Sequence, residues 1–105
     1  MNKLTVVIVS SALLALSIGG AWAGGNAAAG KKKAEDCGDC HGPDGRGDGD
    51  TIPALAGISP EKFTQAMEDF RTGKRKGSKM MAKQGHKLSP SDVEDLAEYY
   101  SQLKP

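Results

Sequence analysis

The chain has 105 residues, of which 38% are hydrophobic and 26% charged, and its formal net charge at pH 7 is +1. A chain of this size forms one small domain, which excludes a multidomain enzyme, a tandem-repeat protein and a polytopic membrane protein. Only 5% of the residues are aromatic. We therefore expect a thin hydrophobic core that needs a disulfide, a metal or a cofactor to support it. The near-neutral charge gives no indication of nucleic-acid binding.

The first 23 residues have the pattern of a secretory signal peptide. Lys3 precedes an uncharged run from Leu4 to Ile18, and the segment ends in Ala21-Trp22-Ala23, an Ala-x-Ala cleavage pattern. The alternative is an uncleaved membrane anchor, although the apolar run is shorter than the roughly 20 residues that span a bilayer. We expect cleavage after Ala23 and export to a bacterial periplasm. The mature domain, residues 24–105, would then have no stable insertion in the membrane.

Helix start and stop signals predict three helices in the mature chain. Asn26 precedes helix-forming residues and predicts a helix over 26–40. A second helix is predicted from Ser59-Pro60-Glu61, a cap followed by proline and an acid, to Gly73. Ser89, with an acid three residues later, begins a third, whose apolar stripe continues to Leu103. No strand pattern is present in the sequence, so the expected fold class is all-α.

Two segments between these helices are predicted to be loops. Residues 42–59 are rich in glycine and proline, which disfavour regular structure. Residues 71–87 contain seven Lys or Arg, no acid and little apolar periodicity. Two loops of about 15 residues are unusual in so small a domain, so we expect a cofactor around which they wrap.

The sequence Cys37-Gly38-Asp39-Cys40-His41 identifies that cofactor. Cys-x-x-Cys-His is the signature for covalent attachment of c-type haem. The two thiols, three residues apart at a helix end, can reach the vinyl groups on one edge of a porphyrin, and the adjacent His41 can ligate the iron. Covalent attachment lets a small core retain a large apolar ring.

Three other interpretations of the same residues explain them less well than haem does. A thioredoxin-like dithiol is disfavoured because that motif follows a strand. A zinc site from Cys37, Cys40, His41 and His86 would require adjacent residues to bind one tetrahedral ion. A structural disulfide suits an exported protein but leaves His41 unexplained.

The iron needs a further ligand from the opposite side of the ring, for which Met67, Met80, Met81 and His86 are candidates. Met67 lies on the apolar stripe of its helix and is better explained as a core residue. His86 is better explained as a solvated residue. Met80 and Met81 lie in the segment that must cross the other haem face, and a thioether there raises the reduction potential relative to a second imidazole.

The sequence resembles the class I c-type cytochromes over most of its mature length, from Asn26 to Lys104. The resemblance is carried by the haem motif and by Ile52-Pro53-Ala54-Leu55-Ala56-Gly57, Asp69-Phe70-Arg71-Thr72-Gly73-Lys74-Arg75, Met80-Met81 and Leu88-Ser89 to Ser101. The later blocks are most similar to the monohaem cytochrome subunit of flavocytochrome c sulfide dehydrogenases, and nearly as similar to domains of dihaem periplasmic cytochromes.

This resemblance implies a small cytochrome c fold, with three main helices and long loops around one covalently attached haem c. It implies that the backbone C=O of Pro53 accepts a hydrogen bond from the ring of His41. The resemblance leaves two choices for the axial ligand. The family's spacing counted back from Leu88 implies Met81, whereas the spacing counted forward from the Lys-Gly-Ser stretch implies Met80. The first and last helices should pack together, with Gly30 allowing close approach to Tyr99 or Tyr100.

The function expected from these residues is one-electron transfer without catalysis. The resemblance favours a subunit that accepts electrons from a sulfide-oxidising flavoprotein. The alternatives are a freely diffusing carrier between periplasmic or membrane redox enzymes, and a haem enzyme or gas sensor with an open iron position. Residues 34–50 carry six acids, whereas 71–87 carry seven bases. This separation indicates either ordinary solvated surface or a dipolar molecule that orients toward a redox partner.

Overall fold

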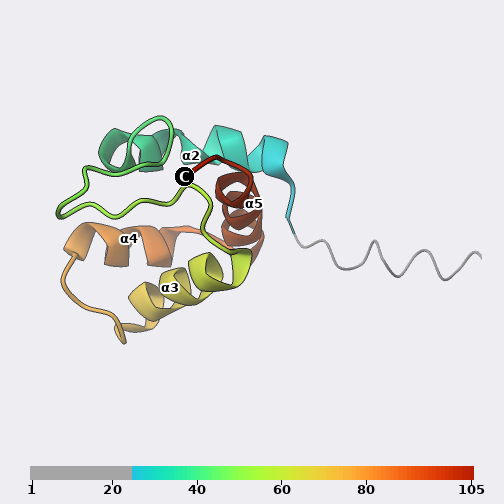
Figure 1. Ribbon diagram of the computed structural model, residues 1–105. Coiled ribbons are helices and arrows are strands. Elements are labelled where there is room, and N and C mark those ends of the chain that lie inside the picture. Colours follow the sequence, from blue (N-terminus) through green and yellow to red (C-terminus); the bar gives the residue numbers. More distant parts are fainter. Residues whose placement is uncertain (1–24) are drawn as a thin grey trace, which may run out of the picture.

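The computed structural model describes residues 25–105, and this part of the chain forms four helices and no strands (Figure 1). The helices are α2 (Ala27–His41), α3 (Pro60–Thr72), α4 (Lys79–Lys87) and α5 (Pro90–Ser101). The all-α expectation is confirmed. The predicted signal peptide, residues 1–23, lies outside the described residues. None of the helices formed by residues 25–105 has the length and apolar character needed to cross a bilayer.

The three predicted helices begin at their predicted capping residues. The side chains of Asn26, Ser59 and Ser89 each accept the backbone N–H of the residue three positions later, which satisfies a donor that the helix itself leaves unpaired. At Ser89 the bond is reciprocal, because the Asp92 carboxylate accepts the Ser89 N–H at 3.0 Å. Gly73 ends α3 in the left-handed conformation, with φ of 82°. Local sequence signals therefore set these helix ends.

The prediction that residues 71–87 form a loop is wrong for its second half, which is helix α4. Ser78 caps this helix by accepting the Met81 N–H at 3.1 Å. The helix lies against α3 at Gly85, where an added Cβ would stand 2.9 Å from the backbone nitrogen of Arg71. Backbone-to-backbone contact at a glycine produces no apolar stripe in the sequence, so a search for hydrophobic periodicity misses it.

Because α4 is only nine residues long, its stability depends strongly on its cap. Replacing Ser78 by alanine should lower the free energy of unfolding by about 1 kcal/mol, the usual effect of losing a serine cap. Denaturant titration of the two proteins tests this value. Ser78→Asp should retain the stability, since aspartate is an equally good cap; a loss as large as that of the alanine variant would contradict the capping role.

Helices α2 and α5 cross in close contact at Gly30 (Figure 1). A Cβ added to Gly30 would overlap the carbonyl group of Asp95 and press on the Cβ of Tyr99. The expected close approach at Gly30 is confirmed, although the neighbour is chiefly the α5 backbone rather than an aromatic ring. Below the crossing, α3 packs on α5 around a core made of Ala34, Phe63, Met67, Phe70, Leu96, Ala97 and Tyr100.

A polar clamp beside this crossing also joins α2 to α5. The Lys33 ammonium lies 2.8 Å from the Asp92 carboxylate and 2.6 Å from that of Asp95. The other oxygen of the buried Asp95 carboxylate accepts the Asn26 N–H at 2.9 Å. The hydrogen bond from Lys33 is the main cause that lowers the pKa of Asp92 to about 2, and it also lowers the pKa of Asp95.

These lowered pKa values predict how stability depends on pH. A carboxylate whose pKa is lower in the folded state stabilises the fold above its unfolded pKa of about 3.9 and loses this effect as the pH falls through the folded value. Lys33→Met should therefore be less stable than the natural protein at pH 6, and the difference should shrink toward zero near pH 2. Denaturant titrations across this pH range measure it, with Lys32→Met as the exposed control on the same helix. If the stability difference between Lys33→Met and the natural protein did not depend on pH, the proposed ion pairing of Lys33 with Asp92 and Asp95 would be contradicted.

Candidate haem site

The haem-attachment motif occupies the last turn of α2. Cys37 is half-buried and packs against the core cluster, Cys40 is exposed, and His41 is buried, with 6% of its surface accessible. Burial raises the pKa of the Cys37 thiol. Neither thiol forms a disulfide. The helix thus presents two sulfur atoms and one imidazole at a single helix end, as the sequence pattern predicted.

The ring of His41 is oriented by one hydrogen bond. Its Nδ1 lies 2.8 Å from the backbone oxygen of Pro53. A carbonyl oxygen can only accept, so Nδ1 carries a proton, and in the neutral ring the lone pair is then on Nε2. No side chain or backbone group within residues 25–105 forms a hydrogen bond with Nε2. A buried nitrogen with an unused lone pair suits a metal ligand, so this observation fits an iron on that side of the ring.

The loop between α2 and α3 holds Pro53 at this distance. The N–H of Gly47 donates to the His41 carbonyl at 2.7 Å, and the N–H of Asp48 donates to the carbonyl of Ile52 at 3.1 Å. The Asp48 carboxylate also accepts the Ile52 N–H at 2.8 Å, which closes the turn just before Pro53. Gly47 has φ of 68°, and a Cβ there would overlap the Ile52 carbonyl. A glycine at position 47 is therefore needed for this turn.

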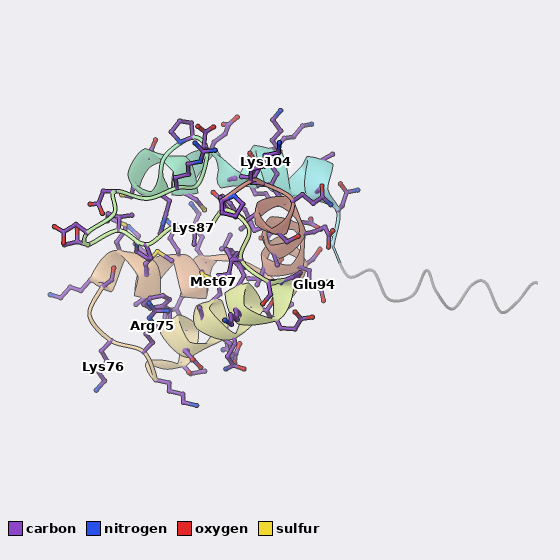
Figure 2. All side chains as sticks on the ribbon, viewed as in Figure 1. Met67, Arg75, Lys76, Lys87, Glu94 and Lys104 are labelled. Atoms are coloured by element: carbon purple, nitrogen blue, oxygen red, sulfur yellow. The ribbon has the colours of Figure 1, made fainter. Side chains whose placement is uncertain are left out.

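The candidate axial methionines have different surroundings. Met67 is buried in the core, as expected for its place on the α3 stripe, and Figure 2 shows it among the helices. On α4, Met81 is half-buried and packs against the core cluster, whereas Met80 is 57% exposed. His86 lies exposed in the last turn of α4. Sequence reasoning gave Ser78 no role, although a serine three residues before Met81 is a recognisable cap for the helix that carries it.

The helices that carry His41 and Met81 do not pack on each other within the described part of the chain. The one side-chain bond between them joins the Lys87 ammonium to the Asp36 carboxylate at 3.5 Å. The glycine-rich loop runs on the same side of the molecule as α4 (Figure 1). An imidazole on one helix and a thioether on another, together with two thiols beside the imidazole, are a donor set suited to haem c.

The zinc interpretation does not agree with these positions. Within residues 25–105 no group of three or more His, Cys, Asp and Glu side chains lies close enough together to hold a metal ion. His86 is on α4, whereas the two cysteines are in the last turn of α2. The residues of the motif therefore fit haem attachment better than a tetrahedral metal site.

Comparison with known proteins identifies the class to which this fold and site belong. The family model for Cytochrome c matches residues 27–104, so the chain belongs to the cytochrome c family. It is accordingly a c-type cytochrome, with covalently bound haem c.

Cytochrome c4 proteins are among the relatives of this chain. The chain is 39% identical to cytochrome c4 of Azotobacter vinelandii over 114 aligned residues, which cover 100% of the chain and 52% of the relative. The crystal structure of reduced cytochrome c4 from Pseudomonas stutzeri has a TM-score of 0.67 and 33% identity, over 76% of this chain and 46% of that one. The chain thus spans about half the length of these relatives.

In one shorter relative, the region that aligns with this chain is almost the whole protein. Cytochrome c-554(548) of Halomonas halodenitrificans is 39% identical over 79 residues, which are 73% of this chain and 95% of the relative. The cytochrome subunit of sulfide dehydrogenase from Chlorobaculum tepidum is 34% identical over 67 residues, 64% of this chain and 59% of that subunit. The expectation that the sulfide dehydrogenase subunit is the most similar protein is therefore not supported, because the cytochrome c4 proteins match better.

Proposed function

We propose that this chain is a freely diffusing carrier of single electrons between redox proteins of the periplasm. The observation that carries the proposal is the hydrogen bond from His41 to Pro53, because it leaves Nε2 of a buried imidazole available to bind an iron. A bound haem c supplies an iron that accepts and releases one electron. The periplasmic location rests on the signal peptide predicted before Gly24.

In this proposal each residue of the site has one task. Cys37 and Cys40 hold the ring through thioether bonds. His41 binds the iron, and the Pro53 carbonyl fixes the orientation of its imidazole and raises its basicity. Met81 would be the second protein ligand of the iron, because its side chain turns toward the core whereas that of Met80 turns toward solvent. An iron held by both His41 and Met81 would have no open position for a substrate, so it would supply electron transfer without bond chemistry.

A diffusing carrier is favoured over a tightly held subunit by the character of the relatives. The matched cytochrome c-554(548) consists almost entirely of the region that aligns with this chain, and cytochrome c4 proteins match better than the sulfide dehydrogenase subunit does. The second candidate is the cytochrome subunit of a sulfide-oxidising flavoprotein, which would accept electrons from the flavin. The resemblance to the Chlorobaculum tepidum subunit is the observation in its favour.

Purification from the native periplasm separates the two candidates. The haem absorption is followed through two unlike columns, and every fraction is assayed for flavin. The carrier proposal predicts that haem elutes without flavin at the size of a small protein. Co-elution of haem and flavin through both columns, followed by haem reduction when sulfide is added, would establish the subunit instead.

A further inference from the structure

The first residue of the described chain, Gly25, lies directly on the backbone of α5. A Cβ added to Gly25 would overlap the carbonyl group of Glu94 and stand 3.0 Å from the Cβ of Glu98. Figure 2 shows Glu94 on the side of the molecule where the chain enters α2. Because no side chain fits between this residue and α5, a glycine is needed here for the chain to pack so closely.

The next residue, Asn26, is held by hydrogen bonds on both its backbone and its side chain. Its N–H donates to the Asp95 carboxylate at 2.9 Å, and its side-chain oxygen accepts the Ala29 N–H at 2.9 Å. The Asp95 carboxylate is buried and also binds the Lys33 ammonium at 2.6 Å. Hydrogen bonds to a charged acceptor are stronger than those between neutral groups, so this contact resists release of residues 25–26 from α5.

These two residues are the second and third after the predicted cleavage point, which follows Ala23. Proteases act on exposed, flexible segments, and they cut a folded chain only after it has opened locally. In the folded domain α5 covers one side of Gly25, and the N–H of Asn26 is already bonded. Neither residue is then free to enter the active site of a peptidase, so folding and cleavage compete for the same residues.

We propose that the signal peptide is removed before the domain folds, and that a chain which folds first keeps it and stays attached to the membrane. The cut is a hydrolysis: the peptide bond between Ala23 and Gly24 breaks, and water supplies a hydroxyl group to the carbonyl carbon and a proton to the nitrogen. The proposal rests on the same signal peptide as the periplasmic location proposed above. The uncharged residues 4–23 are the tether of a chain that folds first.

The order of the two events therefore divides the protein between a released carrier and a tethered one. Cleavage of a folded precursor proceeds only through the molecules in which residues 25–26 have left α5. Their release breaks the bond to Asp95 and the cap of α2 together. We expect the released fraction to be smaller than about one in ten, because both interactions are lost in the same step.

Treatment of the haem-bound precursor, residues 1–105, with purified signal peptidase tests this order. Inhibition of signal peptidase in the producing cells lets the precursor accumulate with its haem, and the protein is then purified in detergent. Electrophoresis with a haem stain follows its conversion to the shorter chain. Cleavage should be at least about ten-fold slower than in a variant with a short glycine-serine insert between Ala23 and Gly24, which gives the enzyme a free segment.

Synthetic peptides of residues 1–30, with and without the same insert, control for recognition by the enzyme. The two peptides should be cut at rates within about two-fold of each other, because neither contains α5 to cover the segment.

Two substitutions in α5 separate the docking of Asn26 from general stability. Asp92→Ala and Asp95→Ala each remove a carboxylate that binds Lys33, but only Asp95 also accepts the Asn26 N–H. Asp95→Ala should accelerate cleavage of the folded precursor several-fold, whereas Asp92→Ala should change it by less than about two-fold. The insertion variant leaves the domain unaltered, so the test stays valid if Asp95→Ala folds poorly.

Equal cleavage of the folded precursor with and without the insert would overturn the proposal, because the docked segment would then be no barrier. Resistance of both precursors to an enzyme that cuts both peptides would also overturn it, since the barrier would lie elsewhere. Resistance of the peptides as well would overturn it and contradict the predicted signal peptide. The one-electron function is tested separately in the same samples: failure of the haem to be reduced by dithionite and reoxidised by hexacyanoferrate(III) would contradict that function and leave the cleavage result standing.

Discussion

Replacing Met81 by alanine is expected to open one axial position of the iron and to change the chemistry of the protein. The reduced variant should bind carbon monoxide readily, whereas the natural protein should not. Its midpoint potential should fall by more than about 0.1 V, a part of the roughly 0.8 V range that axial ligands control, because a thioether stabilises the reduced iron. Visible spectra under carbon monoxide and a redox titration measure both effects.

Met80→Ala is the matched control for this prediction. Met80 and Met81 are adjacent on α4, but the first is 57% exposed and the second packs against the core cluster. The Met80 variant should therefore keep the potential of the natural protein and its resistance to carbon monoxide. If the two variants exchanged these behaviours, Met80 would be the ligand and α4 would have to turn when haem is attached.

The second large effect is expected at the crossing of α2 and α5. Gly30→Ala places a methyl group where the carbonyl group of Asp95 already lies, so the helices must separate. We expect a loss of about 3 kcal/mol in the free energy of unfolding, the upper part of the usual range for overpacking. Thermal or denaturant unfolding of the haem-bound protein gives the value.

Gly38→Ala in the same helix controls for helix propensity. The nearest atom to an added Cβ at Gly38 is 3.8 Å away, which is ordinary contact. This variant should be neutral or more stable by up to about 1 kcal/mol, because alanine favours a helix over glycine. A loss at Gly30 no larger than at Gly38 would show that the crossing tolerates a wider separation than the structure indicates.

Much of the fold could be predicted because its signals are local. Asn26, Ser59 and Ser89 cap their helices through bonds within a single turn, so the sequence alone indicates where each helix starts. Helix α4 has a local signal too, the Ser78 cap, but it lacks the apolar stripe that would have supported the prediction of a helix there. It is stabilised by the contact of Gly85 with the backbone of α3 and by the packing of one side chain, Met81, against the core, and neither interaction produces an apolar stripe in the sequence.

The features of the site can likewise be separated into those that are local in the sequence and those that depend on tertiary structure. The Cys37-x-x-Cys40-His41 motif is contiguous, so its chemistry is readable from the sequence. The hydrogen bond from His41 to Pro53 spans 12 positions and was expected only from family resemblance. The choice between Met80 and Met81 depends on which face of α4 turns inward. Adjacent helical residues point about 100° apart, and only the packing of α4 on α3 determines which of them faces the core.

One measurement tests the central claim, that this chain transfers single electrons with both iron positions held by its own residues. It is a redox titration of the purified, haem-bound protein, followed by visible absorbance and performed once under argon and once under carbon monoxide. We expect a single one-electron transition with the same midpoint potential in both gases. A midpoint that rises under carbon monoxide would contradict it, because the gas could raise the potential only by occupying an open position on the reduced iron.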